Sequence, residues 1–128
     1  MSERHLKDIL EDVRALAVEF YRKTGRPLGV TGEFAEAAAA EVLDIVLAPV
    51  RQVGFDATCR TTGERIQIKG RAVSRPVNNS AKLGRIRPDI DCDSVLLVLL
   101  SKEELLPIGM WKAPVAAVLA RLETPGAN

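Results

Sequence analysis

The sequence predicts one α/β domain, and three stretches of the chain support this fold class. Ser2–Lys23 carries apolar side chains at helical spacing, whereas Val53–Arg71 has the form of a strand, a turn and a second strand. Val95–Leu100 is a run of aliphatic residues without alternation, which is typical of a central strand buried on both faces. The chain has 128 residues, of which 47% are hydrophobic, and this is enough apolar mass for one core.

The composition excludes several classes of protein. The net charge is +1, so no overall field favours nucleic acid or a membrane surface. No apolar run approaches the roughly 20 residues that span a bilayer. The single histidine, His5, excludes His-based triads and multi-histidine metal sites by count, and we expect it to be solvated. Cys59 and Cys92, without a signal-like N-terminus, predict a cytoplasmic protein with reduced thiols rather than a disulfide.

The first predicted helix, Ser2–Lys23, is amphipathic, and charged residues occupy the face opposite its apolar stripe. Gly25, with Pro27 beyond it, is the expected stop. The apolar stripe consists of Leu6, Ile9, Leu10, Val13, Leu16, Ala17 and Phe20.

The second predicted helix runs from Gly32 to about Leu43, with Thr31 as its N-cap. Glu33 and Glu36 lie three positions apart and so share one face of its first turn. The plain interpretation is that these acids stabilise the helix through its dipole, by roughly 0.3–1 kcal/mol each. The side chains expected to face a core are Phe34, Ala37, Ala38, Val42 and Ile45.

Three strands are predicted next. Ile45–Ala48 reads as a short edge strand that Pro49 ends, and two longer strands follow at about Val53–Arg60 and Arg65–Arg71. If Thr62-Gly63 is the turn between them, antiparallel pairing places Asp56 opposite Lys69.

Side chains on the second strand of this hairpin alternate between its two faces. Gln67 and Lys69 therefore point one way, while Ile66 and Ile68 point the other way and anchor the hairpin in a core. An acid, an amide oxygen and an amine would then meet at one end of the hairpin.

A basic segment follows. Ala72–Asp89 is rich in turn-forming residues, and a loop of this length in a compact domain is usually functional or mobile. Positive charge between Glu64 and Asp89 would suit a phosphate backbone, or it would simply keep a solvated loop soluble. The charged residues between these two acids are all cationic: Arg65, Lys69, Arg71, Arg75, Lys82, Arg85 and Arg87.

The C-terminal third is predicted to hold the buried strand Asp93–Leu100, an edge strand at Leu105–Trp111 and a last helix at Val115–Leu122 that Pro114 opens. We expect Trp111 to serve packing rather than base stacking. The alternating aspartates Asp89, Asp91 and Asp93 lack the glycine and glutamate of a calcium loop, and one of them is expected to cap the start of the buried strand.

An ordered series of short motifs resembles the PD-(D/E)XK nuclease superfamily, the restriction-endonuclease-like fold. The series is Gly32–Glu36 on a helix, then Gly54–Asp56, then Ile66–Gly70. The resemblance covers roughly Thr31 to Leu100. It implies an α/β fold with a restriction-endonuclease-like core, in which helices flank a mixed central sheet. The chain would be one nuclease-like domain, residues 1–128, with a core at about 31–123 and helix 2–23 as an N-terminal addition.

The resemblance also implies roles for particular residues. Asp56 matches the metal-binding aspartate, Gln67 takes the place of the second acid, and Lys69 matches the lysine that positions or activates water. Glu36 matches the helix glutamate, with Glu33 as its rival, and one of them should approach Asp56 and the Gln67 amide. The implied cofactor is Mg²⁺, with Mn²⁺ as an alternative, because such ions prefer oxygen ligands. The residues implied to hold nucleic acid are Arg71, Arg75, Lys82, Arg85 and Arg87.

Gln67 departs from the family pattern, which more often has an acid there. A glutamine oxygen can coordinate a metal but brings no charge, so the departure weakens the case for catalysis more than the case for the fold. Three hypotheses therefore stay open: an endonuclease acting on nucleic acid, with DNA favoured over RNA; a non-catalytic module of the same fold that binds nucleic acid or a partner protein; and an unrelated α/β domain. A homodimer is compatible with the first two, and no membrane association is expected.

Overall fold

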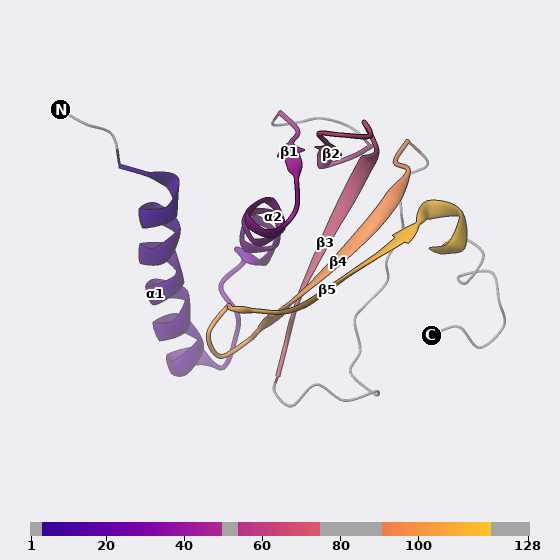
Figure 1. Cartoon of the computed structure of the whole chain (residues 1–128). Coiled ribbons are helices and arrows are strands. Elements are labelled where there is room, and N and C mark those ends of the chain that lie inside the picture. The colour runs from indigo at the N-terminus through magenta and orange to yellow at the C-terminus, as the bar shows by residue number, and fades with distance from the viewer. Residues whose placement is uncertain (1–3, 50–53, 75–90, 119–128) are drawn as a thin grey trace, which may run out of the picture.

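The fold is that of a computed structural model, which describes residues 4–49, 54–74 and 91–118. Helices and strands are both present, so the predicted α/β class is confirmed. Their order along the chain matches the prediction, and Figure 1 shows their arrangement. The elements are α1 (Leu6–Thr24), α2 (Thr31–Val42), β1 (Ile45–Leu47), β2 (Ala57–Cys59), β3 (Arg65–Val73), β4 (Ser94–Ser101) and β5 (Pro107–Pro114).

The strands form one mixed sheet in the order β1-β2-β3-β4-β5. β1 with β2, β2 with β3, and β4 with β5 are antiparallel pairs, whereas β3 and β4 are parallel. A parallel pair needs a long crossover connection, and residues 75–90, which lie outside the described part of the chain, belong to it. The predicted edge positions of the first and last strands are confirmed.

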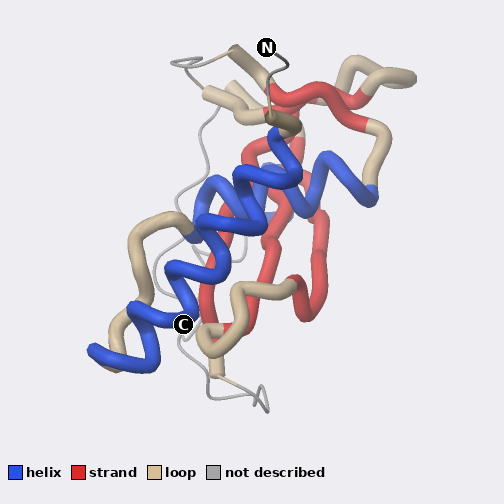
Figure 2. Tube along the Cα trace, turned by 90° about the vertical axis from the view of Figure 1, so that its left-hand side faces the viewer, coloured by secondary structure: helices blue, strands red, loops and turns tan. Residues whose placement is uncertain are grey.

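Both described helices lie on one side of the sheet, with α2 next to the strands and α1 outside it (Figures 1 and 2). Gly70 of β3 makes the close approach of α2 possible. A Cβ atom at this position would lie 2.6 Å from the Cβ of Ala35 and 3.2 Å from the carbonyl oxygen of Thr31. The sheet face that carries Gly70 is therefore the one that α2 covers.

The core lies between α2 and this face of the sheet. Phe34 and Ala35 of α2 pack with Ile66 and Ile68 of β3, so the predicted anchoring of the hairpin is confirmed. On β4, both alternating sets of side chains are buried, as predicted for a central strand. Leu96, Val98 and Leu100 belong to the core under α2, whereas Val95 and Leu99 are buried on the opposite face.

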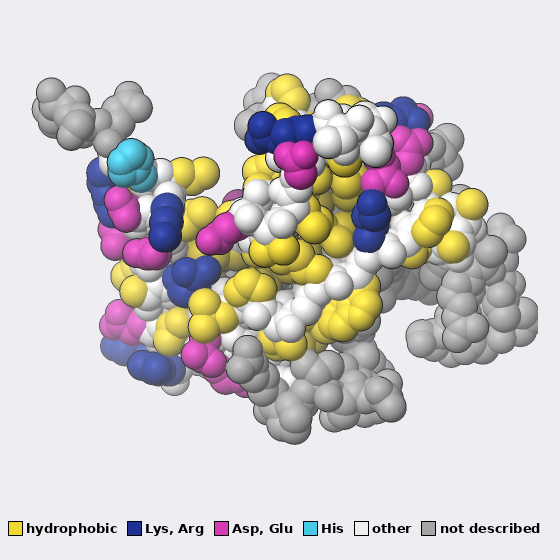
Figure 3. Space-filling model, in the orientation of Figure 1, with side chains coloured by type: hydrophobic (Ala, Val, Ile, Leu, Met, Phe, Trp, Pro, Cys, Tyr) yellow, Lys and Arg dark blue, Asp and Glu magenta, His cyan; other side chains and the backbone are white. Residues whose placement is uncertain are grey.

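Helix α1 buries only part of its apolar stripe. Ala17 is buried, and Arg14 lies 4.9 Å above the ring of Phe34 in a cation–π contact. By contrast, Leu6 and Leu16 are 66% and 62% exposed. Apolar side chains therefore show at the surface of α1, on the left of Figure 3. Within the described residues, neither helix is both long and apolar enough to cross a bilayer.

The ends of the helices differ in detail from the prediction. The stop at Gly25 is confirmed, because this residue has a left-handed φ of 73° and donates its N–H to the carbonyl of Tyr21. Thr31 is wrong as an N-cap: it is the first helical residue of α2, and Val30 precedes it without a side-chain cap. Val42 is wrong as a core residue, since it ends the helix and is 68% exposed.

The strand predicted at Val53–Arg60 is shorter than expected, because within the described residues β2 covers only Ala57–Cys59, whereas the other boundaries are close to those predicted. His5 is exposed, and it begins α1 without a side-chain cap. A helical turn starts at Val115, directly after β5, but residues 119–122 of the predicted last helix lie outside the described part of the chain. No disulfide joins Cys59, which is half-buried, to Cys92, which is buried.

Candidate functional site

The turn between β2 and β3 is longer than the predicted turn at Thr62-Gly63. Gly63 has a left-handed φ of 74°, and its N–H donates to the carbonyl of Cys59 at 2.9 Å. Cys59 in turn donates its N–H to Glu64 at 2.8 Å, so the loop spans Arg60–Gly63. A glycine that follows a polar residue suits the left-handed end of this longer loop as well as a tight turn, which explains the wrong prediction.

The longer turn changes the register of the hairpin. Ala57 pairs with Ile66, and the N–H of Asp56 also donates to the carbonyl of Ile66, so the predicted pairing of Asp56 with Lys69 is wrong. The register differs by two positions, an even number, so the side chains keep their predicted faces. Asp56 is therefore joined to the backbone of Ile66 and Ile68 rather than placed across from Lys69.

Asp56 lies where β2 and β3 separate. Its N–H donates to the carbonyl of Ile66 at 2.8 Å, and its carboxylate Oδ2 accepts the N–H of Ile68 at 2.7 Å. A side chain thus continues the hydrogen-bonded ladder at the point where the β2 backbone leaves it. Because this bond fixes the carboxylate, the position of Asp56 is set by the edge of β3.

Glu36 is the acid from α2 that approaches this point. Its side chain is half-buried, whereas Glu33 is exposed. Burial raises the pKa of Glu36, and the negative charges of Asp56 and then Glu33 raise it further. The structure therefore brings together two carboxylates from α2 and the start of β2. It also favours Glu36 over Glu33 as the acid next to Asp56.

Gln67 and Lys69 are half-buried and share one face of β3. By alternation this face is the one that α2 does not cover, so Glu36 reaches Asp56 from the opposite side of the sheet. Lys69 takes part in none of the ion pairs between described residues. Gln67 and Lys69 therefore lie on one face of the sheet and Glu36 on the other, with Asp56 at the edge of β3, so the structure does not gather the predicted residues on one face.

Arg71 brings a cation to the same edge of β3. Its guanidinium donates to the carbonyl of Gly70 at 2.8 Å. This carbonyl points to the same side of the strand as the N–H of Ile68, about 7 Å farther along. Arg71 and Asp56 therefore both bind backbone groups along the same edge of β3. The other residues predicted to hold nucleic acid, Arg75, Lys82, Arg85 and Arg87, lie outside the described residues.

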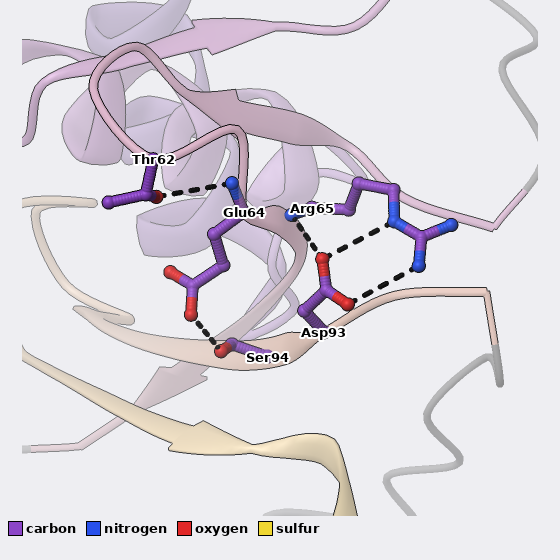
Figure 4. A network of polar contacts seen from close by, with 5 residues as sticks. All are labelled: Thr62, Glu64, Arg65, Asp93 and Ser94. Carbon is purple, nitrogen blue, oxygen red and sulfur yellow. Dashed lines mark hydrogen bonds and ion pairs between the residues drawn. The ribbon is translucent and has the colours of Figure 1, made fainter.

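A second polar cluster occupies the opposite end of β3 (Figure 4). The carboxylate of Glu64 accepts the hydroxyl of Ser94 at 2.6 Å and the amine of Lys112 at 2.7 Å. Asp93 binds the backbone N–H of Arg65 at 2.8 Å and also its guanidinium. The expectation that one aspartate caps the start of the buried strand is confirmed for Asp93.

Sequence reasoning missed most of this cluster, because its members come from three strands and share no local motif. The hydrogen bond from Lys112, followed by that from Ser94, lowers the pKa of Glu64. The hydrogen bond from the Arg65 side chain is the main cause that lowers the pKa of Asp93. Arg65, which was counted with the basic segment, is thus part of a structural ion pair at 3.3 Å.

No group of three or more histidine, cysteine, aspartate or glutamate side chains within the described residues could hold a metal ion. The candidate site offers two carboxylates and one neutral amide instead. No model of a known protein family matches the chain, and no curated protein is significantly similar to it in sequence.

Proposed function

We propose that this protein is a metal-dependent nuclease or nuclease-like phosphodiesterase, with its site where β2 and β3 separate. The observation that carries the proposal is the placement of two acids from different elements: Asp56 is fixed at the edge of β3 by the N–H of Ile68 at 2.7 Å, and the half-buried Glu36 of α2 has a pKa that burial and then the charge of Asp56 raise. Acids held together against their repulsion are typical of functional sites. The order of a glutamate-bearing helix, a hairpin with Asp56 and Lys69, and a buried strand also supports a restriction-endonuclease-like core.

The donor atoms fit one small, hard cation. Asp56 uses Oδ2 for the N–H of Ile68, and its Oδ1 lies outside that hydrogen bond. Together with the carboxylate of Glu36 this makes a pair of oxygen ligands, which Mg²⁺ and Mn²⁺ prefer, whereas Gln67 lies on the face of β3 away from α2. The divalent charge would also relieve the repulsion that raises the pKa of Glu36. Two carboxylates favour a single, weakly held ion that keeps several waters.

The side chains have separate roles in the proposed reaction. Asp56 and Glu36 would hold the ion, and Gln67, on the other face of β3, would add a polar group without charge beside it. Lys69 positions the attacking water by donating a hydrogen bond, and Arg71 offers positive charge to the phosphate at the edge of β3. When bound, the metal supplies a water of lowered pKa and charge beside the phosphate.

A second candidate function is a nuclease-fold module that binds nucleic acid or a partner protein without cutting. The observation that favours it is the neutral side chain of Gln67 where the motif more often has an acid, together with the lack of a group of three metal-binding side chains among the described residues. In that case Lys69 and Arg71 would serve binding alone.

Isothermal titration of Mg²⁺ and Mn²⁺ tests the proposal. Asp56→Asn removes a charge yet keeps an oxygen for the N–H of Ile68, and Glu36→Gln removes the second charge. We expect both variants to lose the binding heat and the metal-dependent cleavage of plasmid and single-stranded DNA. Glu41→Gln is the matched control, since Glu41 is an exposed acid on the same helix, and it should bind and cleave as the wild type does.

The dependence of binding on pH adds a second readout. Because protons compete with the metal for Glu36, affinity should fall as the pH drops through the raised pKa of this residue. A folded wild type that binds neither metal would rule out the nuclease. Gln67→Glu then separates the remaining cases: new metal binding and cleavage would indicate a weakened enzyme, whereas unchanged nucleic-acid binding without cleavage would indicate the module.

A further inference from the structure

Trp111 on β5 is unusually exposed for its size. The expectation that it packs in the interior is wrong, because 55% of the side chain is accessible to solvent. The far edge of its indole lies over Gly109: the Cη2, Cζ3 and Cζ2 atoms are 2.6–3.2 Å from the place where a Cβ would stand. The glycine therefore leaves room for the ring to lie along the strand. Such a ring presents a flat apolar surface at the edge of the sheet.

The sheet places a cation in line with this ring. Lys69 on β3 is the Cα partner of Leu97 on β4, and Leu97 is the Cα partner of Trp111. Side chains at paired positions share a face, so all three project from the face that α2 does not cover. Neighbouring strands are about 4.8 Å apart, which puts Lys69 and Trp111 about 10 Å apart across the sheet.

We infer that this row, Lys69–Leu97–Trp111, binds single-stranded nucleic acid. An unpaired base stacks on the indole of Trp111, and the phosphate backbone passes over Leu97 to the ammonium of Lys69. Exposed aromatic rings beside cations are the two components that proteins use for single strands, because every base has a stacking face and every nucleotide a phosphate. A duplex hides its base faces and cannot use the ring in this way.

The inference deepens the proposed function and rests on it for the role of Lys69, which lies at the proposed site. It adds the form of the substrate: a single strand or an unpaired region that runs from the candidate site across the sheet to β5. The small net charge of the chain fits a short contact of this kind rather than a broad field.

Tryptophan fluorescence tests the inference directly, since Trp111 is the only tryptophan in the chain. The wild-type protein is titrated in EDTA, so that no metal or cleavage is needed, with a single-stranded oligothymidylate and with a DNA duplex of equal length. We expect the single strand to quench the emission in a saturable way and the duplex to leave it nearly unchanged.

Variants are compared by the anisotropy of a fluorescein-labelled oligothymidylate. Trp111→Ala should weaken binding by about 5- to 150-fold, the range for loss of one stacked base, and Trp111→Phe should restore part of it. Leu106→Ala is the control, because Leu106 is an exposed apolar residue in the turn before β5. Circular dichroism confirms that each variant is folded.

Three results would overturn the inference: no quenching by any single strand, equal quenching by the duplex, or emission that changes with protein concentration alone. The last would assign Trp111 to a protein interface. The outcome is separable from that of the proposed function. Quenching without metal binding would contradict the nuclease proposal and support single-strand binding at Trp111. Metal-dependent cleavage without quenching would support the nuclease proposal and contradict single-strand binding at Trp111.

Discussion

The two ends of β3 hold charge in opposite ways. At the end near the turn, Glu64 is bound by Ser94 and Lys112, and a second ion pair joins Arg65 to Asp93. At the other end, the half-buried Glu36 approaches Asp56, a residue of like charge. The first arrangement lowers the pKa of Glu64, and the second raises the pKa of Glu36.

This difference separates a structural cluster from a candidate site. In the cluster around Glu64, paired opposite charges join β3, β4 and β5. Because each charge already has a partner, a ligand would gain little by binding there. Like charges held together cost stability, so they point to a ligand or a reaction that uses them. The Asp56–Glu36 pair is therefore the better candidate for a functional site, although the cluster around Glu64 has more hydrogen bonds and ion pairs.

The largest expected effect comes from separating α2 from β3. Gly70→Ala places a methyl group against Ala35 and the backbone of Thr31, and we expect a loss of about 1–3 kcal/mol in the free energy of unfolding. The same change should move Glu36 away from Asp56 and lower its pKa. Urea unfolding and NMR titration of Glu36 measure the two effects.

Gly32→Ala is the matched control, because nothing lies within 4 Å of an added Cβ on Gly32 in the same helix. It should leave stability unchanged or raise it by up to about 1 kcal/mol. Equal stability of the Gly70 and Gly32 variants would contradict the close packing of α2 on β3.

Replacing Glu64, the centre of the polar cluster at the turn end of β3, should have the next largest effect on stability. Glu64→Ala leaves the buried hydroxyl of Ser94 and the amine of Lys112 without their acceptor, at a cost of about 1–3 kcal/mol in urea unfolding. Glu64→Gln keeps an oxygen for one of them and should cost less. If both variants were as stable as the wild type, the cluster would have no structural role.

The two ends should also respond to pH in opposite directions. The lowered pKa of Glu64 means that its contribution is present above about pH 4.5 and is lost as the pH falls through the folded-state value. The raised pKa of Glu36 means that the folded state binds the extra proton, so its cost grows as the pH rises above about 4.5.

Glu36→Gln should therefore stabilise the protein at pH 7, by less than about 1 kcal/mol because solvent screens the partly exposed side chain. The gain should disappear at pH 4, where the wild-type side chain is protonated. Thermal unfolding at the two pH values measures it, and destabilisation at pH 7 would show that the two acids do not repel.

The smallest effect concerns the turn that joins the two strands. Hydrogen bonds from Thr61 and Thr62 lower the pKa of Cys59 to about 7. The rate of alkylation by iodoacetamide should rise with a midpoint near pH 7, and Thr61→Ala should shift this midpoint upward toward 9. Cys92 is buried and should react only after unfolding. An unchanged midpoint in the variant would assign the shift to another cause.

Much of the site's layout was predictable because alternation along a strand is a local property. The pattern of Ile66 and Ile68 against Gln67 and Lys69 fixed the two faces of β3, and an even error in register did not disturb them. The motif order likewise pointed to Asp56 and Glu36. The hydrogen bond from Asp56 to Ile66 was not predictable, since the register of the hairpin depends on the backbone conformation of Gly63 in the turn.

The sequence by itself determined the order of the helices and strands, the double burial of β4 and the stop at Gly25, because periodicity and glycine conformation act over a few residues. Only the tertiary structure decided that Glu36 meets Asp56, that Glu64 joins Ser94 and Lys112, and that Trp111 stays exposed. These outcomes depend on contacts between residues far apart in the chain, and no local pattern encodes which neighbour the folded chain supplies.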